Sequence, residues 1–253
     1  MILQGSQLCK EVENMVSFTI TDYKELPPDV PENASIGGKL SFVSIKSAPV
    51  AQGVILWIME LAGGPEFESS AAYPTLAPSL LSLARIIAKH HPFARPEVLN
   101  VAFLFLKHKA PELSYEKVKA LKQQILRLLV WLATWSQALG VFGYFAKRLE
   151  KGTGTAEIDS SLLRYFIGGS LQIIQPPLSV PLVKVLSKMF GTKACIDAVK
   201  SPHFHESKKA LLPKLLDYFE NTYEEEKTKS RSTCSISSDE MTLVKSLKII
   251  YKE

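Results

Sequence analysis

The sequence predicts an all-α protein that folds as a HEAT- or armadillo-like helical-repeat solenoid of roughly eight or nine helices. Apolar residues recur at three- and four-residue intervals along most of the chain, and proline or glycine breaks separate the apolar segments. Paired helices also return at a spacing of about 40 residues, which is typical of such repeats. The repeats do not match one another in sequence, so a compact helical bundle is the alternative.

The first expected helix is Pro49–Ala62, because Pro49 suits a first helical turn and Gly63-Gly64 ends the pattern. Its apolar stripe is expected to consist of Val50, Val54, Trp57, Ile58 and Leu61. A strand is possible before it, at Lys39–Ile45. Further helices are expected over residues 73–91, 95–108, 114–138, 139–151, 161–174, 179–190 and 206–226.

These elements divide the chain into three expected parts. Residues 1–48 are a weakly patterned N-terminal segment, and residues 49–226 form the helical-repeat scaffold domain. Residues 227–253 are expected to be a polar, disordered tail, since KTKSRSTCSISSDE is serine-rich and lacks a core pattern. The final MTLVKSLKIIYKE can form a short amphipathic helix.

The helix expected at Ser161–Ile174 is apolar almost all the way round, and Arg164 is its single charged residue. Such a helix needs neighbours on several sides, so we expect it to lie inside a stack of helices. The Gly168-Gly169 pair would let another backbone come close. Arg164 is then the residue of this helix expected to reach a polar group on a partner.

Composition places the chain among ordinary globular proteins, with 46% hydrophobic and 22% charged residues. The net charge of +5 permits contact with nucleic acid or acidic proteins without requiring it. Three widely spaced cysteines give no disulfide framework and no zinc ribbon. The N-terminus lacks the pattern of a secretory signal, so a cytosolic or nuclear location is expected.

Catalytic chemistry is not expected, because no nucleophile motif, zinc-protease motif or paired-carboxylate arrangement stands in a supporting context. No cofactor is expected either, since the GTGT beginning at Gly152 lacks the lysine and the preceding strand of a phosphate-binding loop. His203 and His205 near Cys195, and the adjacent His90 and His91, match no standard metal spacing. No metal site is therefore expected.

An uncharged run of 19 residues, Leu128–Ala146, raises the alternative of a membrane-associated helical protein. Cations flank the run, and Trp131, Trp135 and Tyr144 would suit membrane interfaces. However, polar residues cluster near Gln137, in the middle of the run. Two buried helices that meet near Gln137 explain the pattern better.

Basic residues gather around one expected helix junction and at the end of the next helix. Such a cluster could neutralise phosphates of a flexible single strand, although a solvated helix face is the more common reason for it. The candidate nucleic-acid contacts are Lys107, Lys109, Lys117, Lys119, Lys122, Arg127, Lys147 and Arg148.

Three stretches of the sequence resemble one known family. The stretch SLLRYFIGGSLQIIQPPLSVPLVKVL, and upstream APVAQGVILWIMELAGGPEF and LAPSLLSLARIIAKHHPFARPEVLNVAFLFLKHK, occur in the same order as in the C-terminal region of the negative elongation factor C/D family. The likeness covers Ala48 to Tyr223 and rests on RYF, the double proline and collinear helices.

The resemblance implies a non-enzymatic, HEAT-like scaffold in the nucleus that holds other negative elongation factor subunits and helps to keep RNA polymerase II paused near promoters. It also implies contact with single-stranded RNA through basic surfaces, and no small-molecule substrate. Family members carry a longer N-terminal region that contacts another member of the complex, whereas only weakly patterned residues precede the likeness here. A generic helical-repeat adaptor for another partner is the remaining alternative.

Overall fold

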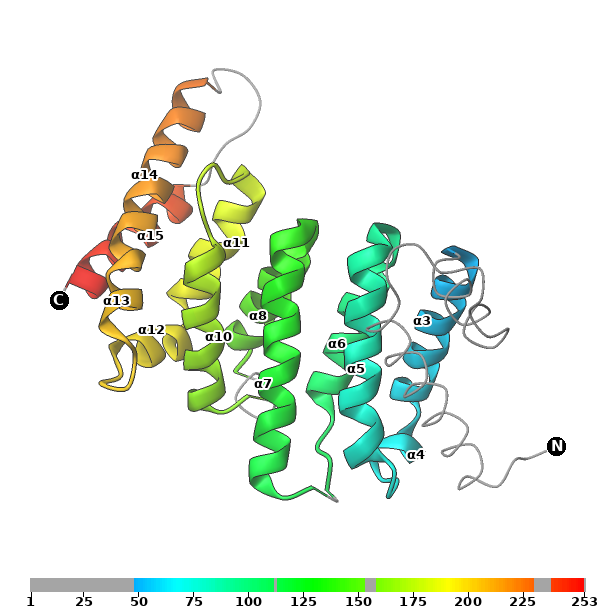
Figure 1. Cartoon of the computed structure of the whole chain (residues 1–253). Helices are drawn as coiled ribbons and strands as arrows, with labels where there is room; N and C mark the ends of the chain where they lie inside the picture. The colour runs from blue at the N-terminus through cyan, green and yellow to red at the C-terminus, as the bar shows by residue number, and fades with distance from the viewer. Residues whose placement is uncertain (1–47, 112, 153–157, 230–237, 253) are drawn as a thin grey trace. The chain divides into compact units, whose positions relative to one another are not determined.

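The computed structural model describes residues 48–111, 113–152, 158–229 and 238–252 (Figure 1). All regular elements within these ranges are helical, which confirms the all-α class. They include ten α-helices of eight residues or more, against the eight or nine expected. The possible strand at Lys39–Ile45 lies outside the described residues, and the solenoid arrangement stays a prediction.

The chain forms two compact units, Met1–Leu128 and Leu129–Glu253. The boundary falls within one long helix, α7, and each unit has buried apolar side chains of its own. The expected division into residues 1–48, 49–226 and 227–253 stays a prediction as a set of domain boundaries.

In unit 1, α3 packs against α5 and α6, and α5 packs against α6. A proline stands in the first turn of α4, α5 and α6, where its fixed φ suits the helix and its missing N–H costs nothing. The described elements of this unit are α3 (Ala48–Gly63), α4 (Pro65–Glu68), α5 (Tyr73–His90), the 3-10 turn η1 (Pro92–Ala94), α6 (Arg95–Lys107) and most of α7 (Tyr115–Leu132).

The buried face of α3 differs from the expected stripe. Only Ile58 of that stripe is buried, together with Ala51, Ile55 and Ala62, while Val50 is 39% exposed. Because α3 is apolar on nearly every side, its periodicity could not tell which side would face the core. The small side chains of Ala51 and Ala62 allow close packing on that side.

His108 joins four segments of unit 1 in its buried interior. Its Nε2 lies 2.8 Å from the Ala62 carbonyl oxygen and its Nδ1 lies 3.1 Å from the Tyr73 hydroxyl. The carbonyl can only accept, so Nε2 carries the proton and Tyr73 donates to Nδ1. Its ring also contacts Phe67 and Phe105, with centroids 6.4 and 5.3 Å away. Burial lowers the pKa of His108 and outweighs the opposing effects of the Ala62 carbonyl and Glu68.

The uncharged run Leu128–Ala146 is broken into two helices, as the sequence suggested. The α-helix ends at Leu132, and a π-helical turn, η2 (Ala133–Gln137), contains Ser136 with φ 80° and ψ 0°. Left-handed backbone at a non-glycine residue ends a right-handed helix. By length and composition the helical stretch Tyr115–Glu150 could cross a membrane, but 44% of its apolar window is buried inside the protein, and core helices pass the same test. The membrane alternative is not favoured.

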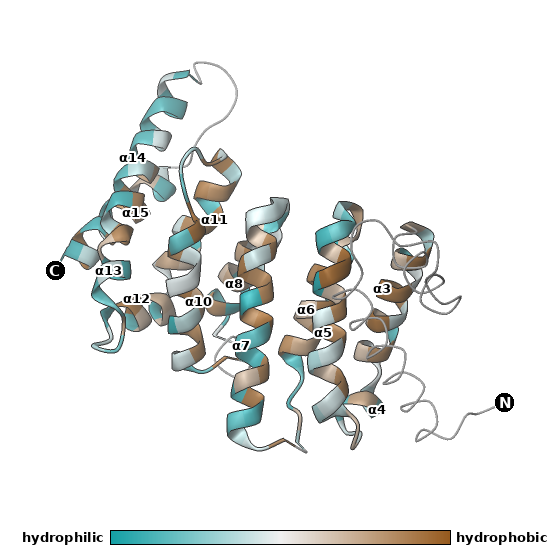
Figure 2. Cartoon of the chain, viewed as in Figure 1, coloured by the Kyte–Doolittle hydropathy of each residue, from teal (hydrophilic) through white to brown (hydrophobic). Residues whose placement is uncertain are grey.

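Unit 2 contains α8 (Ala138–Glu150), α10 (Ser160–Ile173), α11 (Val180–Gly191), α12 (Lys193–Lys200), α13 (Glu206–Lys209), α14 (Leu211–Lys229) and α15 (Ser238–Lys252). The most extensive contact joins α11 to α8, while α12 packs on α10 and α15 packs on α14 and α11. The last turns of α14 are hydrophilic (Figure 2), and most of their residues are exposed.

The burial expected for the helix at Ser161–Ile174 is confirmed in α10. The Phe166 ring is fully buried and stacks on Phe145 with centroids 3.9 Å apart, and Phe142 lies 6.2 Å away. The glycine pair meets side chains rather than a backbone. A Cβ at Gly168 would lie 3.0 Å from Cδ of Lys208, and one at Gly169 would lie 3.5 Å from Val130.

The expected disordered tail is wrong for residues 238–252, which form α15. Val244, Leu247 and Tyr251 of this helix are buried, so the short amphipathic helix seen in MTLVKSLKIIYKE is present and packed. The tail prediction failed because the residues that receive α15 lie far away in sequence. Residues 230–237 lie outside the described residues.

Replacing Phe166 by Ala should lower the free energy of unfolding by about 3–5 kcal/mol, because a stacked, fully buried ring leaves a cavity. Urea denaturation followed by circular dichroism measures the change. Gln172→Ala on the exposed side of α10 is the matched control and should change stability by less than about 0.5 kcal/mol. Equal stabilities of the two variants would contradict the inner position of α10.

The stability of the chain should fall as the pH drops below the unfolded pKa of His108, about 6.5. The folded pKa is lower than the unfolded one, so the unfolded state binds the proton first and the stabilising contribution is complete only above that pH. Urea denaturation at pH 7.5 and 5.5 measures the difference. His108→Asn should be less stable at both values and should lose part of this pH dependence; an unchanged pH dependence would show that His108 is not its source.

Candidate functional site

A hollow of about 790 Å3 lies where the ends of several helices of unit 2 meet. The C-terminal ends of α8 and α11 and the N-terminal ends of α10 and α12 border it, and Leu243 of α15 adds an apolar side chain. Gly152 and Ile158, which flank residues outside the described ranges, also line it.

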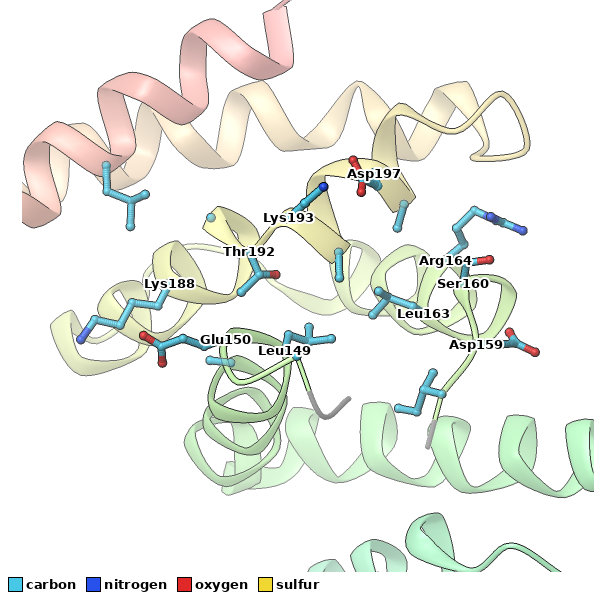
Figure 3. A pocket seen from close by; sticks show the side chains of 17 residues that line it. Leu149, Glu150, Asp159, Ser160, Leu163, Arg164, Lys188, Thr192, Lys193 and Asp197 are labelled. Atoms are coloured by element: carbon cyan, nitrogen blue, oxygen red, sulfur yellow. The ribbon is translucent and has the colours of Figure 1, made fainter. Parts of the chain in front are cut away.

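The lining combines an apolar floor with charges of both signs (Figure 3). Arg164 and Asp159 lie at one end of the hollow, while Lys188 and Glu150 lie at the other (Figure 3). The α12 helix supplies the third pair of opposite charges, Lys193 and Asp197. The apolar part of the lining consists of Ala146, Leu149, Ile158, Leu163, Ala194, Ala198 and Leu243.

Two helix caps fix the geometry of this hollow. Asp159 Oδ1 accepts hydrogen bonds from the Leu162 backbone N–H at 2.8 Å and from the Ser161 hydroxyl at 2.7 Å, which starts α10. The Thr192 hydroxyl accepts from the Cys195 N–H at 3.4 Å and starts α12. Each cap oxygen satisfies a backbone donor that the helix itself leaves without a partner.

Arg164 is the sequence-predicted partner contact, and the structure places it in the wall of the hollow. The residue is of intermediate exposure, and its guanidinium makes no hydrogen bond or ion pair with any of the described residues. A guanidinium presents up to five N–H donors in a planar fork that fits a carboxylate. This arrangement can hold an acidic side chain of another protein, with apolar contact on the floor beside it.

The six basic residues predicted around the α6–α7 junction do not share one face. Lys107 and Lys109 flank the buried His108, and the Lys109 backbone N–H donates to Glu68 Oε1. On α7, Lys119 and Lys122 lie about 60° apart around the helix axis, whereas Lys117 lies at least about 140° from either. The structure therefore brings Lys119 and Lys122 together but separates Lys117 from both.

Aromatic rings accompany two of the predicted cations. Lys119 Nζ lies 5.8 Å from the Tyr115 ring centroid in unit 1. In unit 2, the Arg148 guanidinium lies 5.5 Å from the Tyr144 ring, and Lys147 beside it is exposed. Arg127 is exposed on α7. Basic side chains beside aromatic rings are the combination with which proteins bind single strands, through phosphate neutralisation and base stacking.

The structure gives little support for metal binding or nucleophilic chemistry at the histidines and the cysteine considered from the sequence. No group of three His, Cys, Asp or Glu side chains within the described ranges is placed to hold a metal ion. His203 and His205 are exposed, while His91 is buried. Cys195 is fully buried, and burial raises the pKa of its thiol to about 12, so it is not a reactive thiolate.

Helix α12 was not expected from the sequence, and Lys193 and Asp197 of the hollow were missed with it. The available signals were Thr192, a good N-cap residue, and the apolar spacing of Cys195, Ala198 and Val199. The helix has only eight residues, and so short a pattern is easily read as a loop.

The regular elements of the described residues are all helical, and the charged hollow of unit 2 lies at helix ends. The chain matches the TH1 protein family over residues 31–212, more than half its length, and it belongs to that family.

Curated relatives give the particular likeness. The chain is 26% identical over 162 residues to negative elongation factor D of Mus musculus and 25% identical over 162 residues to that of Sus scrofa. Each match covers 64% of this chain and 26% of the relative, so the chain spans about a quarter of the length of the relatives it matches. The resemblance to the negative elongation factor C/D family is thereby confirmed.

Proposed function

We propose that the chain acts as a non-enzymatic scaffold subunit in a negative elongation factor complex and contributes to promoter-proximal pausing of RNA polymerase II in the nucleus. The observation that carries the proposal is the TH1 family match together with the likeness to negative elongation factor D. Both names point to a regulatory protein rather than to an enzyme. The all-helical packing supports a HEAT-like arrangement, in which neighbouring helices present extended surfaces to partners.

The hollow of unit 2 is the proposed contact with another member of the complex. Arg164 is of intermediate exposure and lines the hollow, and its guanidinium has no hydrogen-bond or ion-pair partner among the described residues, so it remains available to an arriving acidic group. Association would supply that group to Arg164 and would cover the apolar floor. No group of three metal-ligating side chains is placed to hold a metal ion among the described residues that line the hollow.

Contact with single-stranded RNA is the second part of the proposal. Lys119 and Lys122, on one side of α7 next to Tyr115, supply positive charge beside an exposed aromatic ring. Single strands bind to such surfaces through phosphate neutralisation and base stacking.

Affinity purification of the tagged chain from nuclease-treated nuclear extract, followed by mass spectrometry, should recover other negative elongation factor subunits and RNA polymerase II. Arg164→Glu should lower the recovery of its direct partner at least about tenfold, because it turns the anchor for a carboxylate into a like charge. Lys227→Glu on the exposed end of α14 makes the same change of charge away from the hollow and should leave recovery unchanged.

The outcomes of this experiment distinguish membership in the complex from the use of the hollow as the contact. A folded chain that captures none of these subunits contradicts the complex membership and favours an adaptor for some other partner. If the wild-type chain captures these subunits and Arg164→Glu captures them equally well, only the use of the hollow is contradicted.

Replacement of Lys117, Lys119 and Lys122 together by Ala should weaken binding of single-stranded RNA and flatten its dependence on salt. Because only Lys119 and Lys122 share a face, the double variant should account for nearly all of the effect, with a loss of slope of about 1.4 in log Kd against log salt. Lys117→Ala alone is the matched control. Filter binding at several salt concentrations gives both quantities, and an unchanged slope in the triple variant would assign these lysines to a solvated face.

A further inference from the structure

We propose that α15 occupies a helix-docking groove of unit 2, and that this groove also accepts an amphipathic helix of a partner protein in place of α15. The groove is the surface of α11 and α14 that α15 covers. The described residues that contact α15 do not include Arg164 or its neighbours at that end of the hollow. The family match ends at residue 212, within α14, so α15 lies beyond the matched residues. The inference does not depend on membership in any particular complex.

The apolar contact of α15 is one narrow stripe. Val244, Leu247 and Tyr251 are the buried side chains among the 15 residues of this helix, and their spacing of three and four places them on one face. Ile249 on another side is 63% exposed. A helix held along a single stripe has the geometry by which amphipathic peptides bind to grooves.

Polar contacts on both sides of the stripe set the direction and register of the helix. Lys248 Nζ lies 2.7 Å from Asp217 Oδ1 and 2.5 Å from Glu220 Oε2, both on α14. At the other end of the helix, Glu240 Oε2 lies 3.3 Å from Lys184 Nζ on α11. A helix inserted in the reverse direction would place like charges together at both ends, so the groove selects one orientation.

Two backbone features of α11 complete the groove. The Tyr251 hydroxyl donates a hydrogen bond of 3.1 Å to the Phe190 carbonyl oxygen. A Cβ at Gly191 would lie only 2.9 Å from Cδ1 of Leu243, so the glycine lets the leucine of the docked helix reach the backbone. These contacts come at the C-terminal end of α11, where carbonyl groups lack helical partners.

The junction under α15 is polar and incompletely bonded, which makes displacement feasible. The Tyr223 hydroxyl is buried there beside the Ser187 hydroxyl, but the two groups do not reach full hydrogen-bonding geometry. Glu240 faces Lys184 as an ion pair but without hydrogen-bonding geometry. Burial raises the pKa of Tyr223, opposed by the Ser187 hydroxyl and reinforced by Glu240. A different helix that satisfied these groups could compete with α15.

The chemistry of α15 describes the competing helix. Its first turn carries an acidic residue that pairs with Lys184, and a leucine three residues later packs against Gly191. Its buried apolar residues lie together on one face of the helix. A lysine eight residues after the acid meets Asp217 and Glu220, and an aromatic hydroxyl three residues further reaches Phe190. The partner helix is expected to carry this order of groups.

Hydrogen exchange and a binding assay on the full-length chain test the inference. A fluorescent peptide with the sequence of residues 238–252 is titrated with wild type and with Leu247→Asp, which removes one buried contact of α15. The peptide should bind Leu247→Asp at least about tenfold more tightly than wild type, because the groove is then more often open. Peptide carrying the same Leu247→Asp change is the matched control and should not bind either chain.

A charge exchange identifies the site of binding. In chains that carry Leu247→Asp together with Asp217→Lys and Glu220→Lys, the wild-type peptide should lose at least about tenfold in affinity. A Lys248→Glu peptide should recover most of that loss. If neither peptide responds to these substitutions, binding occurs elsewhere and the proposal is wrong.

Amide exchange in the wild-type chain keeps the test decisive if Leu247→Asp unfolds unit 2. The amides of α15 should exchange at least about tenfold faster than those of α10, because α15 detaches while the inner helix stays in place. Equal protection of the two helices would overturn the proposal, as would a loosened chain that keeps α10 protected but binds no peptide. Exclusive formation of dimers by exchange of α15 would assign the groove to a second copy and would also overturn it.

Discussion

The stacked contact between Phe145 and Phe166 fixes the centre of unit 2. It ties α8 to α10 through two fully buried rings, and α11 and α12 then pack on these two helices. Arg164 precedes Phe166 by two residues, which places it about 200° away around the axis of α10. When Phe166 faces the aromatic core, Arg164 therefore turns away from it and into the wall of the hollow. The polar site is in this sense a consequence of how the core is packed.

Local signals in the sequence were sufficient to find most of the helices and the inner position of α10. Prolines in first turns and glycine stops act within a few residues, and such signals can be read without knowledge of the fold. The packed face of α3 could not be read in this way, because a helix that is apolar all round gives no preference to one side. The break at Ser136 was located only approximately, since serine carries no strong preference for left-handed backbone.

Features that depend on distant residues escaped prediction for a different reason. The packing of α15 relies on Asp217, Glu220 and Phe190, each of which lies at least 28 residues before its partner in α15. The hollow needs the ends of four helices and a leucine from a fifth. The basic residues illustrate the opposite error, because closeness in sequence was taken for closeness in space. Lys117 and Lys119 are two residues apart and still point in nearly opposite directions.

The His108 site in unit 1 and the α15 junction in unit 2 differ in how fully their polar groups are bonded. Both ring nitrogens of His108 have partners, and the surrounding aromatic rings leave little freedom for movement. The α15 junction instead contains a buried tyrosine hydroxyl, that of Tyr223, whose contact with the Ser187 hydroxyl lacks full hydrogen-bonding geometry. Buried polar groups favour one arrangement strongly when all are satisfied, and only weakly when some are not. The bonded surroundings of His108 therefore suit a permanent contact between segments, whereas the α15 junction suits a contact in which another helix can replace α15.

The turn at Ser136 also matters while the protein is being made. It divides the apolar run, but buried side chains of α8 pack on α10 and α11, which are synthesised later. At a rate of about 5–20 residues per second, the roughly 45 residues between Ala146 and Phe190 take about 2–9 seconds to add. During that interval the nascent chain presents an uncharged segment as long as a membrane span. Whether this segment becomes buried inside the folded protein therefore depends on how quickly translation adds the helices that cover it.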